Sequence, residues 1–299
     1  MSDYRGRFAP SPTGPLHFGS LVAALGSFLQ ARARGGRWLV RMEDLDLPRN
    51  APGAADAILR TLEAHRLLWD EEVAYQSTLT ERYGAALERL TSQGLVYPCA
   101  CTRKELGDSV IAVDGAAIYP GTCRGGLPPG RVARALRLRV HGDVSVADRI
   151  QPPLVQRLEQ EVGDFVLRRA DSVYAYQLAV VVDDAAQGIT EVVRGADLFL
   201  STPRQIFLQA ALGLPRLGYA HLPLALDLRG GKLSKQTLAD PLVDSRPVDN
   251  LIEALRFLGQ SPPRRDDVRT PDELLAWAAP HWDMARVPRE RGLTWRRGA

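Results

Sequence analysis

The sequence predicts an α/β protein built around a parallel, nucleotide-binding sheet. Residues 5–42 read as strand, glycine-bearing loop, helix and strand, which is the opening of a βαβ unit. Further runs of strand length follow at 189–194 and 221–226, with a helical segment between them. Apolar residues make up 45% of the chain and charged residues 24%, values typical of globular proteins. Such sheets bind nucleotides beyond the carboxyl ends of their strands, so candidate functional residues are expected there.

The first unit can be read element by element. Residues 5–9 read as a short strand, and prolines with a glycine stop regular structure over 10–15. Residues 19–34 predict a helix, and a glycine pair follows as its stop. The apolar residues with helical spacing are Leu21, Val22, Leu25, Phe28 and Leu29. Residues 38–42 read as the second strand.

The middle of the chain contains one predicted helix and then a segment of different composition. Thr78 and Glu81 have the spacing of a capping box, so we expect a helix from Thr78 to Gln93. Residues 95–98 read as a strand. Residues 99–130 are rich in glycine, proline and cysteine and lack periodicity, which indicates an inserted module, with a long surface loop as the alternative.

Regular structure returns after this segment. Strands are expected at 135–140 and 164–168, followed by a buried apolar run at 174–182. Pro203 in the first turn favours a helix over 202–212. Near the end of the chain, two helices at 248–258 and 271–279 are expected around a proline-containing linker at 261–265.

Charge and cysteine usage narrow the class of protein. The formal charge of +3 allows a polyanionic partner but is far below that of a dedicated nucleic-acid binder. Only Lys104, Lys232 and Lys235 are lysines, against 35 arginines. No apolar run resembles a signal peptide or a membrane span, so we expect a cytoplasmic protein that does not enter a membrane. The three cysteines lie in one stretch, which argues against a disulfide framework.

Two distant segments carry residues suited to phosphate chemistry. His17 and Gly19 lie where the first strand gives way to the first helix, and helix N-termini with a glycine favour bound phosphate. Lys232 and Lys235 lie on a loop after a late strand, where two ammonium groups could neutralise charge on a departing pyrophosphate. Taken singly, a helix-capping histidine and a solvated basic turn are the simpler readings.

Together these segments resemble the HIGH and KMSKS motifs of class I aminoacyl-tRNA synthetases. Residues 7–14, the Arg-Met-Glu-Asp run at 41–44 and the Val-Arg-Gly-Ala-Asp run at 193–197 are similar to glutamyl-tRNA synthetases in particular. The resemblance covers residues 5 to about 258. It implies a Rossmann-like parallel nucleotide-binding sheet with a zinc-bearing insertion and a small helical C-terminal region.

The resemblance also implies roles for individual residues. ATP would contact His17, Gly19, Lys232 and Lys235, with His17 and Lys235 as the catalytic pair. L-Glutamate would contact Arg7, Ser11, Glu43, Tyr176 and Arg194. Glu43 would pair the α-ammonium group, while Tyr176 and Arg194 face the side-chain carboxylate; the division of roles between Arg7 and Arg194 stays open. Mg²⁺ is expected with ATP.

The cysteines predict a structural zinc site. Cys99, Cys101 and Cys123 supply three thiolates, and a closed tetrahedral site needs a fourth ligand, for which Tyr119 and His141 are candidates. The Cys-x-Cys and Tyr-x-x-x-Cys spacing is similar to that of the short glutamyl-queuosine enzymes, which favours Tyr119. Three inert thiols are the alternative.

Only 63 residues follow Gln236, which is too few for the anticodon-binding region of full-length glutamyl-tRNA synthetases. This length, the Lys-Leu-Ser-Lys-Gln run at 232–236, His-Phe-Gly-Ser at 17–20 in place of HIGH and the cysteine spacing resemble the glutamyl-queuosine tRNA(Asp) synthetases, which attach glutamate to queuosine in tRNA(Asp). The alternatives are a minimal synthetase that charges a tRNA 3′ end and a non-catalytic RNA-binding paralogue.

We expect a monomer with four segments: residues 1–98, the first half of the catalytic domain; 99–132, the zinc insertion; 133–214, the rest of the insertion and the second catalytic half; and 215–299, the lysine loop and helical region.

Overall fold

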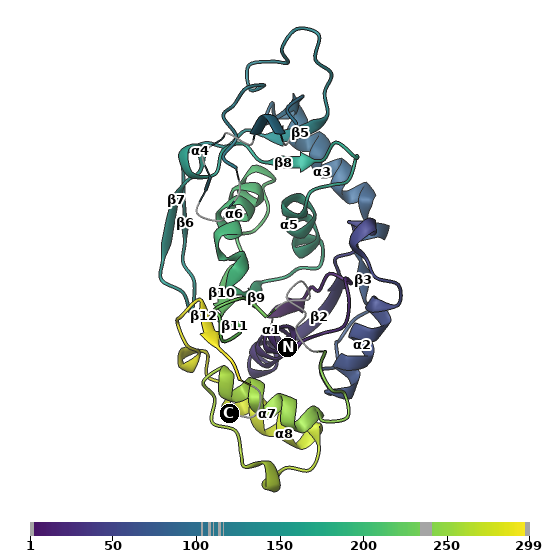
Figure 1. Ribbon diagram of the computed structural model, residues 1–299, viewed down its shortest axis with the longest axis vertical. Coiled ribbons are helices and arrows are strands. Elements are labelled where there is room, and N and C mark those ends of the chain that lie inside the picture. Colours follow the sequence, from purple (N-terminus) through teal and green to yellow (C-terminus); the bar gives the residue numbers. More distant parts are fainter. Residues whose placement is uncertain are drawn as a thin grey trace.

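The computed structural model describes residues 3–102, 104–106, 109, 111–112, 115, 117–233 and 241–296. These residues form an elongated molecule, with the C-terminal helices α7 (Pro247–Phe257) and α8 (Pro271–His281) at one end. The strands β4 (Val96–Cys99), β5 (Ala135–Leu138) and β8 (Val166–Arg168) lie towards the other end. The helices α5 (Tyr176–Ala186) and α6 (Thr202–Ala211) lie between these ends (Figure 1).

The expected βαβ unit opens the chain. Strand β1 (Arg5–Phe8) pairs in parallel with β2 (Arg37–Met42), and helix α1 (Phe18–Ala33) connects them. The short strand β3 (Ala74–Tyr75) continues this sheet in parallel beside β2. Strands β9 (Glu191–Gly195) and β10 (Gly218–Leu222) form a second parallel pair. The two sheets lie edge to edge, since the Thr190 N–H donates to the Arg5 carbonyl at 2.9 Å.

Helix α1 packs against both parallel sheets. Its side chains Leu21, Leu25 and Leu29 are completely buried in the larger apolar core. The helix begins after His17, whose Nδ1 accepts the Ser20 N–H at 3.3 Å. The return to β2 needs Gly36, because a Cβ there would lie 2.3 Å from the Tyr4 carbonyl oxygen. The sequence prediction for this unit is therefore confirmed.

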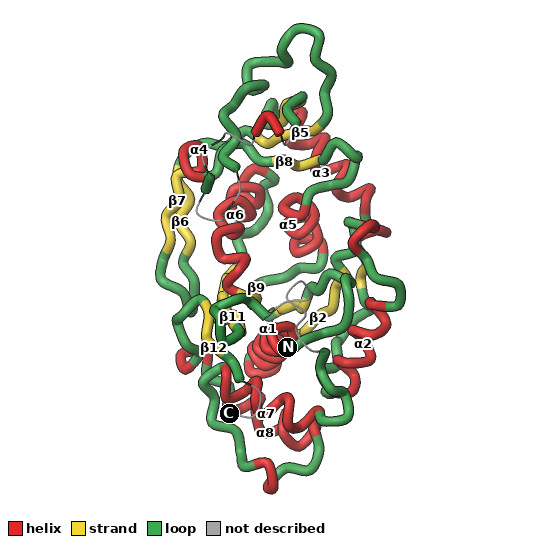
Figure 2. Tube along the Cα trace, in the orientation of Figure 1, coloured by secondary structure: helices red, strands yellow, loops and turns green. Residues whose placement is uncertain are grey.

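The residues after α3 (Thr80–Ser92) build an antiparallel sheet in the order β4-β5-β8. Strands β4 and β5 are neighbours in that sheet, so the cysteine-containing segment joins two adjacent strands. Its described part is mostly loop (Figure 2). A separate antiparallel hairpin follows, made of β6 (Asp143–Val146) and β7 (Leu154–Arg157), and leads into the short helix α4 (Leu158–Glu161).

Two sequence predictions need correction, one for the start of helix α3 and one for the strand at 221–226. Helix α3 begins at Thr80, not at a Thr78 capping box: Thr78 donates to the Tyr75 carbonyl at 2.8 Å, and Asp44 accepts the Ser77 N–H at 2.8 Å. The preceding turn is thus fixed from outside the helix. The buried apolar run expected at 174–182 is present, and it lies mostly in helix α5.

The expected strand over 221–226 is divided at Pro223, which lacks an N–H group. Its first part belongs to β10, and its second part is β11 (Leu224–Leu226). Strand β11 pairs in parallel with β12 (Gly292–Thr294), which the sequence reading did not foresee. Just beyond β12, the Trp295 ring stacks on Phe18 with 4.2 Å between the ring centroids.

Both expected C-terminal helices are present as α7 and α8. Helix α8 has a complete capping box, because Thr270 accepts the Glu273 N–H and the Glu273 side chain accepts the Thr270 N–H. Helix α2 (Ala54–Ala64), which the sequence reading did not identify, packs Ile58 and Leu62 into the larger core. Within the described part of the chain, no helix combines the length and the apolar character needed to cross a membrane.

Candidate active site

A pocket of about 580 Å³ opens where β1 and β9 end and α1 begins. Eight of the nine residues predicted to contact ATP or glutamate line it: Arg7, Ser11, His17, Gly19, Glu43, Tyr176, Arg194 and Lys232. The ninth, Lys235, lies outside the described residues. One pocket therefore contains residues from both motif segments, as a shared nucleotide site requires.

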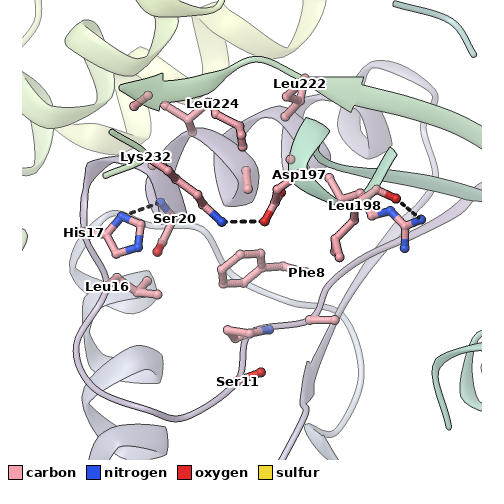
Figure 3. A pocket seen from close by; sticks show the side chains of 18 of the residues that line it. Phe8, Ser11, Leu16, His17, Ser20, Asp197, Leu198, Leu222, Leu224 and Lys232 are labelled. Atoms are coloured by element: carbon pink, nitrogen blue, oxygen red, sulfur yellow. Dashed lines mark hydrogen bonds and ion pairs between the residues drawn. The ribbon is translucent and has the colours of Figure 1, made fainter. Parts of the chain in front are cut away.

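One part of the pocket has the character expected of a phosphate site. Because Nδ1 of His17 accepts the Ser20 N–H, Nε2 carries the proton of the neutral ring and is a donor. A Cβ on Gly19 would lie 3.3 Å from the His17 ring, which explains the need for a small residue there. The Lys232 ammonium reaches towards this region and pairs with Asp197 at 2.5 Å (Figure 3).

The chain on either side of the undescribed residues 234–240 is attached to the pocket. Leu233, a pocket-lining residue, donates its N–H to the Ala225 carbonyl at 2.9 Å. Leu242 donates its N–H to the Leu16 carbonyl at 3.0 Å, and Pro241 forms a β-bridge with His17. These bonds connect the start of α1 to the lysine-bearing segment.

A buried ionic network forms another part of the pocket. Arg7 is 3% exposed, and its Nε donates to Asp184 at 3.1 Å. Arg41 contacts the same carboxylate at 2.8 Å and also contacts Glu43 at 3.2 Å. Burial raises the pKa of Glu43, although the Arg41 and Arg7 guanidinium groups oppose this effect. Burial would also raise the pKa of Asp184, but Arg7 and Arg41 outweigh it and lower that pKa.

This network bears on which arginine can attract a substrate carboxylate. The Arg7 guanidinium is already paired with a carboxylate, whereas the hydrogen bonds of Arg194 go to neutral acceptors. Nε of Arg194 donates to His221 Nε2 at 3.1 Å, and Nη2 donates to Thr202 at 3.0 Å and to Gln205 at 2.8 Å. Arg194 is 6% exposed, so its positive charge is screened little by water.

Tyr176 lies beside Arg194, with 3.5 Å between the phenol oxygen and Nη1 of Arg194. Burial, together with the Glu43 carboxylate, raises the pKa of Tyr176 to about 12. The phenol therefore remains protonated near neutral pH and can donate to an anion. A guanidinium and a phenol side by side form a binding site suited to a carboxylate.

The sequence reading missed the residues that orient this arginine. His221 on β10 contacts Asp148 in the β6–β7 turn, with 2.5 Å between Nδ1 and Oδ2, and both side chains are completely buried. The second Asp148 oxygen accepts the backbone N–H groups of Ile150, Gln151 and His221. Asp184, next to apolar residues on α5, was missed as well. No local pattern marks these residues, because their contacts depend on the tertiary fold.

The three cysteine sulfurs lie within 4.8 Å of one another. The Tyr119 hydroxyl lies 3.4 Å from Cys99 Sγ and 3.6 Å from Cys101 Sγ. Cys101 and Cys123 are 3.7 Å apart, close to the edge of about 3.8 Å that a tetrahedron with 2.3 Å zinc–sulfur bonds would have. The other candidate ligand, His141, packs its ring against Phe207.

Arg137 adds positive charge beside this group of thiols. Its Nε donates to Cys99 Sγ at 3.3 Å, and its guanidinium lies 3.8 Å from the centroid of the Tyr119 ring. Burial would raise the pKa of Cys99, but hydrogen bonds from Tyr119 and Arg137 outweigh it and lower that pKa. The surroundings of Cys99 thus favour its thiolate, the form that binds metal, whereas burial raises the pKa of Cys101.

Comparison with known proteins agrees with this geometry. The family model described as tRNA synthetases class I (E and Q), catalytic domain, matches residues 3–113 and 132–275. The glutamyl-Q tRNA(Asp) synthetase of Dechloromonas aromatica is 61% identical over 292 residues, covering 97% of each chain. The protein of the same name from Aromatoleum aromaticum is 56% identical, covering 96% of this chain and 91% of its own.

The chain belongs to the glutamyl-Q tRNA(Asp) synthetase family. Solved structures relate this family member to longer enzymes. A glutamate tRNA ligase from Elizabethkingia meningosepticum, solved with its amino acid, is 25% identical with a TM-score of 0.78. The match covers 96% of this chain and 66% of the ligase. The glutamate-tRNA synthetase of Elizabethkingia anophelis gives 25% identity and a TM-score of 0.80, with coverages of 98% and 68%.

In this glutamyl-Q tRNA(Asp) synthetase family member, the class I match is interrupted between residues 113 and 132. Tyr119 and Cys123 lie in that interruption, while Cys99 and Cys101 lie just before it. The cysteine cluster is therefore built partly from a segment that the general catalytic-domain model does not match.

Proposed function

We propose that this protein activates L-glutamate with ATP and transfers the glutamyl group to the queuosine base of tRNA(Asp). The main support is the single pocket that joins a phosphate-binding part, with His17 and Lys232, to a carboxylate-binding part, with Arg194 and Tyr176. The membership of the glutamyl-Q tRNA(Asp) synthetase family supports the choice of amino acid and acceptor.

In the first step, an oxygen of the glutamate α-carboxylate attacks the α-phosphorus of ATP. The bond from that phosphorus to the bridging oxygen breaks, which yields glutamyl adenylate and pyrophosphate without a protein nucleophile. His17 donates a hydrogen bond to the reacting phosphate, and Lys232 and Lys235 offset the charge that develops on pyrophosphate. A Mg²⁺ ion bound with ATP would add positive charge at the departing pyrophosphate.

In the second step, a hydroxyl oxygen of the queuosine cyclopentenediol attacks the adenylate carbonyl carbon. The new ester bond forms, the bond to the AMP phosphate breaks, and the hydroxyl proton is released along with AMP. The residues of the pocket hold the adenylate in place for this attack, and no covalent enzyme intermediate is needed.

Two sets of residues select glutamate in this proposal. Arg194 and Tyr176 bind the side-chain carboxylate, because the hydrogen bonds of Arg194 to the described part of the chain all go to neutral acceptors. Glu43 pairs with the α-ammonium group, and Arg7 and Ser11 bind near the α-carbon. Burial disfavours the ionised form of Glu43. A substrate ammonium group beside the carboxylate would offset this cost.

We also propose that Cys99, Cys101, Cys123 and Tyr119 hold a structural Zn²⁺ ion. The sulfur separations and the thiolate-favouring position of Arg137 support this donor set. The ion would anchor a segment with little apolar core of its own. We further propose that the chain divides at residues 98, 132 and 214 and that it acts on tRNA as a monomer in the cytoplasm.

The decisive experiment compares the transfer of labelled glutamate to tRNA(Asp) with and without queuosine, and to tRNA(Glu). We expect labelling of queuosine-containing tRNA(Asp) alone. Labelling of tRNA(Glu) would instead support a minimal synthetase that charges the 3′ end. The absence of glutamate-dependent ATP–pyrophosphate exchange would indicate a protein that only binds RNA.

A further inference from the structure

Arg194, His221 and Asp148 form a chain of hydrogen bonds with a defined direction. Asp148 Oδ2 lies 2.5 Å from His221 Nδ1, and an ionised carboxylate can only accept. Nδ1 therefore carries the proton of the neutral imidazole, and Nε2 is left as an acceptor. The Arg194 Nε–H donates to that Nε2 at 3.1 Å. The tautomer of one buried histidine thus decides whether Arg194 finds an acceptor.

The imidazole of His221 is neutral near pH 7. Burial lowers the pKa of His221 to about 4, despite its hydrogen bond to Asp148. A neutral ring between the aspartate and the arginine orients the guanidinium without a direct ion pair. A carboxylate in direct contact with Arg194 would compete with the carboxylate of a substrate, as Asp184 would at Arg7.

The remaining contacts of Arg194 determine which guanidinium nitrogen faces the pocket. Nη2 donates to Thr202 at 3.0 Å, to Gln205 at 2.8 Å and to the Leu198 carbonyl at 3.3 Å. Nη1 lies beside the Tyr176 hydroxyl, and both residues line the pocket. With Nε held by His221 and Nη2 held by α6, Nη1 is the nitrogen directed towards the pocket.

Asp148 is itself rigidly held, although it lies outside the parallel sheets. Three backbone N–H groups donate to its Oδ1, from Ile150 at 3.0 Å, Gln151 at 2.9 Å and His221 at 3.2 Å. The next residue, Arg149, donates its N–H to the Tyr219 carbonyl at 3.0 Å. The turn between β6 and β7 is thereby attached to β10.

We propose that Asp148 and His221 are positioning residues that hold Arg194 in the orientation needed to bind the glutamate side-chain carboxylate. This inference rests on the proposed function, in which Arg194 binds that carboxylate. It assigns to the β6–β7 turn a role in selecting the amino acid, and it separates this role from the binding of ATP at His17 and Lys232.

The substitution Asp148→Asn tests the donor and acceptor order of the hydrogen bonds between Asp148, His221 and Arg194. The asparagine oxygen can still accept the three backbone N–H groups, while its NH₂ group replaces Oδ2 and donates to His221 Nδ1. The proton of His221 then moves to Nε2 and faces the Arg194 Nε–H, so the two donors repel each other. In ATP–pyrophosphate exchange, we expect KM for glutamate to rise at least about tenfold, the loss typical of a hydrogen bond to a charged group. KM for ATP should change less than about twofold.

A pair of substitutions at His221 separates orientation from packing. His221→Gln retains an oxygen that can accept from Arg194, so its KM for glutamate should stay closer to that of the wild type. His221→Leu fills similar space without an acceptor and should resemble Asp148→Asn. His65→Gln is the control, since His65 is also fully buried but bonds to Thr61 and Asn250 outside the pocket. Thermal unfolding checks that each variant is folded.

Nitrogen-15 NMR of the histidine rings reports the tautomer directly. We expect the His221 proton on Nδ1 in the wild type and on Nε2 in Asp148→Asn. The inference is overturned if Asp148→Asn and His221→Leu leave KM for glutamate unchanged, or if both KM values rise together. If Asp148→Asn does not fold, equal KM values for His221→Gln and His221→Leu overturn it. Failure of the proposed function is seen separately, because wild-type protein would then show no glutamate-dependent exchange.

Discussion

The Lys232 ammonium lies 2.5 Å from the Asp197 carboxylate, within the pocket proposed to bind ATP. Both side chains are partly exposed, at 44% and 35%, so this ion pair contributes less than about 1 kcal/mol to stability. A bound triphosphate offers Lys232 a more highly charged partner. The contact therefore holds the lysine near the phosphate site and can be exchanged when the nucleotide enters.

We predict that Lys232→Ala lowers ATP–pyrophosphate exchange about 100-fold, because a cation that stabilises the departing pyrophosphate is lost. The free energy of unfolding should change by less than about 1 kcal/mol. Exchange assays and urea titration measure the two effects. Lys104→Ala is the matched control, since Lys104 lies in the inserted segment. Exchange at the wild-type rate in Lys232→Ala would rule out a role for this ammonium.

Tyr176→Phe should raise KM for glutamate about tenfold and leave KM for ATP nearly unchanged. The phenol donates to the substrate carboxylate, and its pKa of about 12 keeps it protonated throughout the usual assay range. Steady-state exchange at varied glutamate measures the change. Tyr174→Phe is a suitable control, because Tyr174 is not among the residues that line the pocket. A uniform loss of kcat without a change in KM would contradict this role.

Stability should fall in mild acid because of His221. Its pKa is about 4 in the folded protein, compared with about 6.5 for an exposed histidine. The unfolded chain therefore binds a proton at higher pH than the folded protein. The contribution of His221 to the free energy of unfolding is therefore complete above pH 6.5 and is lost as the pH falls towards 4. The loss between pH 7 and pH 4 amounts to about 3 kcal/mol.

His221→Gln should lose this component, so its free energy of unfolding should change less than that of the wild type between pH 7 and pH 4. Denaturant titrations at several pH values measure the difference. His141→Gln is the control, because His141 is exposed and its replacement leaves His221 in place. Parallel pH profiles for wild type and His221→Gln would show that His221 is not the group responsible.

Purified protein should contain about one zinc ion per chain, and Cys123→Ser should lower that content. Tyr119→Phe should weaken zinc binding at least tenfold in competition with a chelator, because the fourth ligand is lost. Metal analysis and chelator titration test both points. Tyr97→Phe is the control, since the Tyr97 hydroxyl donates to Asp164 rather than to a sulfur. Equal affinity in Tyr119→Phe and wild type would remove Tyr119 from the ligand set.

Local sequence patterns were sufficient for the first βαβ unit, whereas His17 and Lys232 were assigned to one site through the resemblance of their segments to the HIGH and KMSKS motifs. Helical spacing and glycine stops fix α1 without help from distant residues. Two further signals were present but overlooked. Val144 and Val146 alternate with polar residues and both are buried in β6, and Ile58 and Leu62 have helical spacing in α2.

Other features could not be read from the sequence. Asp148 and His221 become partners only when the β6–β7 turn packs on β10, which no periodicity encodes. Asp184 follows an apolar run, yet it is the shared partner of Arg7 and Arg41. Pairing between β11 and β12 joins segments more than 60 residues apart, so it depends on the packing of the intervening helices.

This late pairing also matters while the chain is being made. Arg7 and His17 leave the ribosome early, but β11 has no neighbour at this edge until Gly292 has been synthesised. A nascent chain that stops short of this point exposes the β11 backbone behind the Leu224 and Ala225 wall of the pocket. The backing of this wall is therefore complete only once the last residues have been made, and substrate binding then stabilises the finished molecule.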